Sequence, residues 1–298
     1  MTRTPRVRPA EGRIRRFRSA GGWIRRLGPA EMLFLAPAVL LLTAVILLPV
    51  VLVLPTGLRH ASLLADDPLL LPIARNTLLF AAASLPLELI LGTLSALLLD
   101  RQFRGRGVVR SFALLPWALP TAVMAMAWRW IFNDTYGMVS ALAALFGASG
   151  SAAWLGDPTG AFWILVAADV WKTTPFVTVL VLAGLQSIPS ELHEAMEVDG
   201  AGPVRRFFWI TLPLLRPALA IAIVFRLIQA LGIFDLPWVL TGGGPANATR
   251  TIAIHIYDQY FRFGESGYGA AITLAAAAGM FALAGGIGLL VRGRRRWA

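Results

Sequence analysis

Four charged residues interrupt long apolar stretches of this sequence, and they are the side chains best suited to do chemistry there: Glu88, Asp169, Lys172 and Arg226. Asp169 and Lys172 are three residues apart, so a helix would place them on one face. The formal charges of the four residues sum to zero. Three interpretations stay open: a polar cavity for a hydroxyl-rich solute, an internal set of ion pairs that fixes helix packing, or a proton relay.

Other catalytic or metal chemistry lacks the residues it would need. The sequence has no cysteine, which excludes disulfides and thiolate metal sites. The three histidines, His60, His193 and His255, are widely separated, and we interpret them as surface residues rather than as one metal site. Lys172 is the single lysine, and no glycine run precedes it in "DVWKTTP", so the chain has no phosphate-binding P-loop. We therefore expect no metal or cofactor on this chain, and an intramembrane enzyme is the weakest hypothesis.

The segments that carry the four charges are long and apolar. Of the 298 residues, 57% are hydrophobic and only 14% are charged, whereas ordinary soluble domains have about 25% charged residues. About 20 apolar residues in a helix cross the hydrocarbon core of a bilayer, and a central charge there costs about 2.5–3.5 kcal/mol. The segments are too long and too uniformly apolar for barrel strands. We expect an all-α integral membrane protein with six transmembrane helices, at about 32–54, 76–99, 111–131, 161–186, 213–235 and 270–291.

The basic residues show which side of the membrane each loop faces. Four segments that six spans would place on one side hold nineteen of the 27 basic residues, and nine of these arginines lie in the first 30 residues. This bias predicts that both termini are cytoplasmic. We divide the chain into a basic cytoplasmic tail, 1–30, and a transmembrane domain, 31–298. The tail is interpreted as an orienting, lipid-facing segment rather than a nucleic-acid-binding one.

The loops on the opposite side are too short to form a domain of their own. None exceeds roughly 35 residues, below the size at which a domain folds alone, so strong capture of a solute from outside must be done by another protein or by the membrane cavity. The segment "LTGGGP" (240–245) is interpreted as a tight turn, with an anion-binding nest of backbone amides as the alternative.

The cytoplasmic loop at 188–213 is more ordered than a spacer needs to be. Ser190 can cap a helix that Asp199 and Gly200 end, and Pro203 can open a second helix at its first turn. The first of these helices would have nine residues, fewer than the 12–15 or so that a marginally stable isolated helix needs. An apolar stripe surrounded by glutamates predicts that this helix lies on a groove of a cytoplasmic partner.

The same loop resembles the EAA loop of binding-protein-dependent ABC importer permeases. The resemblance rests on Glu194-Ala195, Gly200 and then Ile210-x-Leu212-Pro213, with Met196 standing where the motif usually has alanine. Further segments, such as "RGRGVVRSFALLPWALPTAVMAMAWRWIFN" and "FDLPWVLTGGGP", are similar to the carbohydrate-uptake branch of that family, the maltose/trehalose type. The fold it implies is the six-span bundle of type I ABC importer permeases. The motif positions in this chain are Glu194, Ala195, Met196, Asp199, Gly200, Ala201, Ile210, Leu212 and Pro213.

The resemblance implies a function and a set of partners. The chain would be the permease subunit of an ATP-driven importer of a sugar, a disaccharide or related glycoside, in the inner membrane of a prokaryote. It would work with a second homologous permease subunit, two ATPase subunits that use ATP and magnesium, and an external solute-binding protein. Residues 194–200 would form the coupling helix. The alternative is an ion-coupled secondary transporter that uses the carboxylates of Glu88 and Asp169.

Overall fold

The computed structural model describes residues 29–146 and 153–293, and within these ranges the regular elements are all helices. The chain forms two compact units, one ending at Val53 and one beginning at Leu54. The predicted basic tail, 1–30, lies almost wholly outside the described residues. The elements are α1 (Pro29–Leu42), the π-helix η3 (Thr43–Leu47), α2 (Leu48–Arg59), η4 (Ala61–Ala65), α3 (Leu70–Asp100), α4 (Arg106–Ala118), α5 (Thr121–Ile131), α6 (Met138–Leu145), α7 (Pro158–Leu185), α8 (Ser190–Val198), α9 (Pro203–Arg206), the π-helix η5 (Phe207–Thr211), α10 (Leu212–Leu231), α11 (Asp235–Leu240), α12 (Ile252–Tyr257), the π-helix η6 (Asp258–Arg262) and α13 (Ser266–Gly293).

The helical segment that begins in the first unit and continues past Val53 carries mostly exposed side chains. Residues Leu33–Arg59 form a 27-residue segment that is long and apolar enough to cross a membrane. Large apolar side chains along it are open to their surroundings, as Phe34 shows with 86% of its surface exposed. Apolar exposure on this scale suits a hydrocarbon environment rather than water.

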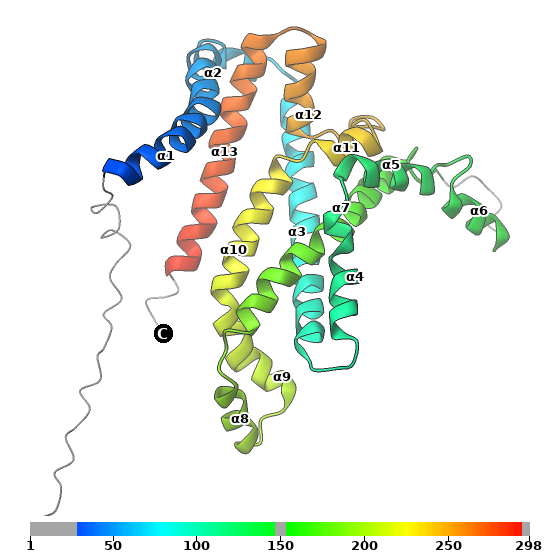
Figure 1. Cartoon of the computed structure of the whole chain (residues 1–298). Coiled ribbons are helices and arrows are strands. Elements are labelled where there is room, and N and C mark those ends of the chain that lie inside the picture. Colours follow the sequence, from blue (N-terminus) through cyan, green and yellow to red (C-terminus); the bar gives the residue numbers. More distant parts are fainter. Residues whose placement is uncertain (1–28, 147–152, 294–298) are drawn as a thin grey trace, which may run out of the picture. The chain divides into compact units, whose positions relative to one another are not determined.

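The core of the second unit is built where α3, α7 and α10 pack on one another, and α3 and α7 share the most extensive contact (Figure 1). Val177 and Val181 of α7 are fully buried in this core together with Leu215 of α10. Gly92 makes the approach of α3 to α7 possible, because a Cβ at this position would lie only 2.6 Å from a methyl carbon of Val177. Small residues at such crossings let two membrane helices come close.

The third predicted span differs from a single straight helix. Residues 111–131 fall in α4 and α5, which meet at an angle of 90° across Leu119 and Pro120. Pro120 cannot donate a backbone hydrogen bond, and the residue before a proline is driven out of the helical region, as the extended Leu119 shows. Five described helices are therefore long and apolar enough to cross a membrane, or six if the bent pair counts as one span.

The second unit has distinct elements at its two ends. Figure 1 shows the short helices α8 and α9 at one end of the bundle and α11 and α12 at the other. From Pro203 to Leu231 the chain is helical without a break, through α9, η5 and α10. One rigid element therefore joins the loop that holds α8 to the interior of the bundle.

Candidate functional site

Three of the four intramembrane charges meet inside the helical core. The guanidinium of Arg226 in α10 holds Glu88 of α3 through two bonds, from Nε to Oε2 and from Nη2 to Oε1, each 2.6 Å long. The same Nη2 donates to Oδ2 of Asp169 in α7 at 2.9 Å. We call Glu88, Asp169 and Arg226 the buried triad; their side chains are at most 5% exposed.

Further hydrogen bonds complete the environment of the buried triad. Nη1 of Arg226 donates to the side-chain oxygen of Gln229, and the hydroxyl of Thr173 donates to Oε1 of Glu88 at 2.8 Å. Bidentate pairing of arginine with a carboxylate is among the strongest polar contacts available in a protein interior. The buried triad therefore ties α3, α7 and α10 together at a single point.

Lys172 does not join the buried triad, although it lies only three residues from Asp169. Its Nζ donates to the carbonyl oxygen of Leu119 at 2.6 Å, at the break between α4 and α5. In the described part of the chain, Lys172 has no carboxylate oxygen within 4.0 Å. The structure thus brings together three of the four candidate residues and places the fourth at the bend of the broken span.

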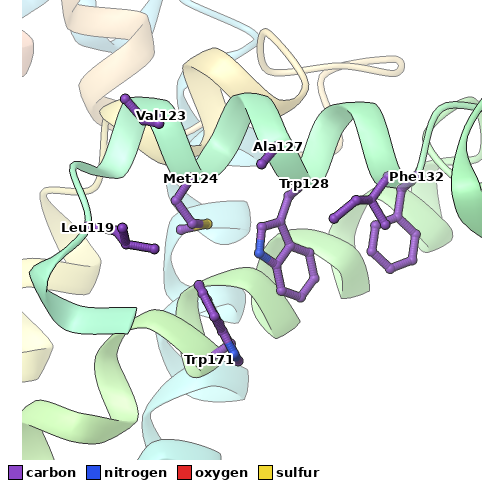
Figure 2. A pocket seen from close by; sticks show the side chains of 8 residues that line it. Leu119, Val123, Met124, Ala127, Trp128, Phe132 and Trp171 are labelled. Carbon is purple, nitrogen blue, oxygen red and sulfur yellow. The ribbon is translucent and has the colours of Figure 1, made fainter. Parts of the chain in front are cut away.

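An apolar pocket of about 400 Å³ opens beside this bend. Figure 2 shows side chains from the break and from α5, with Trp171 of α7 facing Trp128 across the pocket. The two indole rings are tilted by 53° with their centroids 6.1 Å apart, and Phe132 stacks on Trp128 at 5.5 Å. The residues that line the pocket are Leu119, Val123, Met124, Ala127, Trp128, Ile131, Phe132 and Trp171.

At the opposite end from α11 and α12, α8 has the length expected from the sequence but begins differently. It runs from Ser190 to Val198, and Ser190 is its first helical residue rather than its cap; Pro189 occupies the cap position, without a side-chain hydrogen bond. The prediction that Ser190 caps the helix is therefore wrong. The end of α8 agrees with the sequence, because Gly200 adopts a φ of +77°, a left-handed conformation that favours glycine.

Two backbone bonds close the C-terminus of α8. The amide of Ala201 donates to the carbonyl of Met196 at 2.9 Å, and the amide of Gly200 donates to Glu197 at 3.0 Å. This pair of bonds is the Schellman arrangement, which satisfies carbonyls that a helix end leaves free. Arg206 of α9 then donates to Glu197 at 2.6 Å, which links the two short helices.

The residues of the EAA-like motif divide into an exposed and a covered part. Glu194, Ala195, Asp199 and Gly200 are exposed on α8 and its end, whereas Ala201 is buried. Ile210, Leu212 and Pro213 are half-buried at the start of the long helix, and Met196 is half-buried on α8. The structure places an acidic surface on α8 directly beside the helix that leads to the buried triad.

His255, Asp67 and Tyr268 form a second polar cluster, at the end of the bundle that holds α11 and α12. His255 of α12 is 2% exposed, so its interpretation as a surface residue is wrong. Its Nε2 lies 2.7 Å from Oδ2 of Asp67, the oxygen that also accepts from the hydroxyl of Tyr268. Burial by itself would raise the pKa of Asp67, but the hydrogen bonds from Tyr268, the Leu69 amide and His255 outweigh it and lower that pKa below its ordinary value.

The glycine-rich segment after α11 is a turn, as its composition indicates. The amides of Gly242 and Gly244 donate to the carbonyls of Trp238 and Thr241, and the amide of Gly243 contacts the hydroxyl of Thr241. These amides are engaged within the protein, which argues against the anion-binding alternative. Among residues 29–146 and 153–293, histidines and carboxylates form no group of three that could hold a metal ion.

Comparisons with known proteins identify the family to which the chain belongs. Residues 88–296 match the family described as binding-protein-dependent transport system inner membrane component. The chain is 47% identical over 198 residues to the trehalose/maltose transport system permease protein MalF of Thermococcus litoralis, and the alignment covers 66% of each chain, just under two thirds of the relative. It is 39% identical over 227 residues to the sulfoquinovosyl glycerol transport system permease protein SmoG of Agrobacterium fabrum, covering 76% of this chain and 72% of that one.

A solved structure matches the fold as well. The chain superposes with a TM-score of 0.79 on a chain of a bacterial ABC transporter involved in the import of the acidic polysaccharide alginate. The match covers 91% of this chain and 96% of the other at 20% sequence identity, so it bears on the fold alone. The predicted all-helical, six-span importer fold is confirmed, with the third span broken as described above.

Proposed function

The chain belongs to the family of inner membrane components of binding-protein-dependent transport systems, and from this membership we propose that it is the permease subunit of an ATP-driven sugar importer. The observation that carries the proposal is the 47% identity over 198 residues to a trehalose/maltose transport system permease protein. A disaccharide or related glycoside is accordingly the substrate class we assign. The matches lend no support to an ion-coupled carrier that uses Glu88 and Asp169.

The energy for transport would come from partner subunits, because the chain has no P-loop of its own. We assign α8, with Glu194, Ala195 and Gly200 exposed, as the coupling helix that docks on an ATPase subunit. The uninterrupted helix from Pro203 to Leu231 then carries a displacement of α8 toward the buried triad. A bundle that shifts as a rigid body in this way is a two-state element that a partner's nucleotide state can bias.

The complete transporter would contain a second permease subunit, two ATPases that use ATP and magnesium, and an external solute-binding protein. In that assembly both termini of this chain, and α8, lie on the cytoplasmic side, as the distribution of arginines indicates. The external solute-binding protein supplies the capture step for which the short outer loops leave no room.

Within the membrane, we assign the four charged candidates to two different roles. The burial of Glu88, Asp169 and Arg226, at most 5% exposed, and the bonds among them support a packing role that holds three helices in register. Lys172 and the pocket beside it, lined by Trp128 and Trp171, are open enough to face a solute. The transport path therefore runs past the bend between α4 and α5.

Charge reversal on α8 tests the coupling assignment. Glu194→Arg should leave membrane insertion intact and abolish ATP-driven sugar uptake by the complex of this chain with its partner subunits. Asp100→Arg is the control, because it reverses an acid on another element, the C-terminal end of α3, whose side chain is 42% exposed and pairs with Arg106 only at 4.0 Å. Full uptake by the Glu194 variant, with its ATPase still bound, would remove α8 from the coupling path.

A further inference from the structure

Lys172 and Arg226 are both cations within apolar spans, but they differ in burial and in hydrogen-bond partners. Arg226 is 3% exposed and bonded to two carboxylates. Lys172 is half-buried, and its only described hydrogen bond runs to the carbonyl of Leu119. An ammonium group has three donors, so two remain for another acceptor. A charge in a membrane span is costly to maintain without a counter-ion and marks a functional site by default.

The surroundings of Lys172 show what kind of molecule could supply that acceptor. Leu119, whose carbonyl Lys172 contacts, also lines the 400 Å³ pocket, and Trp171 is the neighbouring residue in α7. All eight side chains that line the pocket are apolar, and Trp128 and Trp171 form an aromatic wall (Figure 2). Such a wall offers flat apolar contact to a ring but few partners for hydroxyl groups.

We propose that the solute recognised here is an anionic glycoside, whose ring lies against Trp128 and Trp171 while its carboxylate, sulfonate or phosphate accepts hydrogen bonds from Lys172. The inference rests on the proposed importer function and names its substrate class more narrowly. A charge-assisted bond to an anion is about twice as strong as a neutral one, so it supplies the discrimination that the apolar wall lacks. The bend at Leu119 brings the pocket wall within reach of the ammonium group.

Two other roles for Lys172 make different predictions. It could serve only as a cap for the Leu119 carbonyl, which the broken helix leaves free; a neutral glutamine would then replace it without altering ligand preference. It could instead balance the buried triad, which carries a net charge of −1 when Glu88, Asp169 and Arg226 are all ionised. In that case removing one triad charge should compensate for the loss of the lysine.

Saturation-transfer difference NMR on the purified chain in lipid nanodiscs tests the proposal, with empty nanodiscs as the blank. The probes are methyl β-glucuronide and methyl β-glucoside, which share a ring and differ at C6 by a carboxylate. We expect the glucuronide to bind at least tenfold more tightly, equivalent to about 1.4 kcal/mol. Lys172→Gln should abolish this preference by weakening glucuronide binding at least tenfold, and Lys172→Arg should retain it.

Two further variants test whether Lys172 pairs with the solute or only balances the charge of the buried triad. Arg129→Gln is the matched control, because Arg129 is also a cation that donates to a backbone carbonyl, that of Val239; its preference for the glucuronide should equal that of the unaltered chain. The double variant Lys172→Gln with Asp169→Asn should remain unselective, and recovery of the preference would show that Lys172 only balances charge. Equal binding of the two probes, or binding of neither, overturns the proposal. Sugar uptake by the intact complex decides the importer function separately.

Discussion

Removal of the Arg226 side chain should destabilise the helical core more than any other single change in the membrane spans. Arg226→Met nearly keeps the volume but leaves Glu88, which is fully buried, and Asp169, which is 4% exposed, without their common cation. Breaking a buried ion pair by removing one partner costs about 3–5 kcal/mol, since the remaining charge is left in a medium of low dielectric constant. Loss of the bond to Gln229 adds about 1 kcal/mol. We expect a total loss of about 4–6 kcal/mol.

Titration with sodium dodecyl sulfate in mixed micelles, followed by circular dichroism, measures the free energy of unfolding. Arg216→Met is the control within the same helix, because Arg216 is exposed; it should change that free energy by less than about 0.5 kcal/mol. The triple variant Glu88→Gln, Asp169→Asn, Arg226→Met removes the unpaired charges along with the cation. It should recover to within about 1.5 kcal/mol of the original protein, because a buried ion pair contributes little net stability against neutral groups of similar size.

Either of two results would refute this reasoning. A loss below about 1 kcal/mol for Arg226→Met would mean that water reaches the carboxylates and screens them. A triple variant as unstable as the single one would mean that the guanidinium acts through shape alone, rather than by neutralising Glu88 and Asp169.

Three further predictions follow from other contacts. Gly92→Leu should separate α3 from α7 and lower the free energy of unfolding by about 1–3 kcal/mol or more, measured in the same titration, because the new side chain meets Val177. Asp67 has a pKa below that of the unfolded chain, so its contribution is present above about pH 4 and is lost as the pH falls through the lower folded value; Asp67→Asn should flatten stability against pH in that acid range. Gly200→Val should cost about 1–2 kcal/mol locally and reduce uptake, whereas Gly200→Asn should be milder, since asparagine tolerates a positive φ and no atom lies within 4 Å of the added Cβ.

The sequence predicts the spans well because apolar length and arginine placement are local signals. It predicts the end of α8 equally well, since Gly200 alone can adopt the left-handed conformation at low cost. The only sequence signal for the bend in the third span is its prolines. Prolines mark where a helix can kink, but the angle of the kink depends on packing against neighbouring helices. The Ser190 error has a similar origin, because Pro189 and Ser190 both suit a helix start and spacing does not rank them.

Pairing across the bundle lies beyond any local pattern. Glu88 and Arg226 are 138 residues apart, and nothing in either segment identifies the other as its partner. Their spacing along one helix suggested an ion pair between Asp169 and Lys172. In the structure the carboxylate of Asp169 accepts from Arg226, and Lys172 donates to the carbonyl of Leu119 at the bend. The burial of His255 depends likewise on Asp67 and Tyr268, which approach it from two other elements. Tertiary packing, rather than spacing, decided each of these contacts.

Uptake of labelled sugars, trehalose and methyl β-glucuronide among them, into proteoliposomes tests the central claim most directly. The vesicles would hold this chain with its proposed second permease subunit and ATPase, with the solute-binding protein added outside and ATP enclosed. Accumulation should require ATP and the solute-binding protein, persist when a proton ionophore is added, and disappear with Glu194→Arg. Accumulation that proceeds without ATP and collapses with the ionophore would contradict an ATP-driven permease.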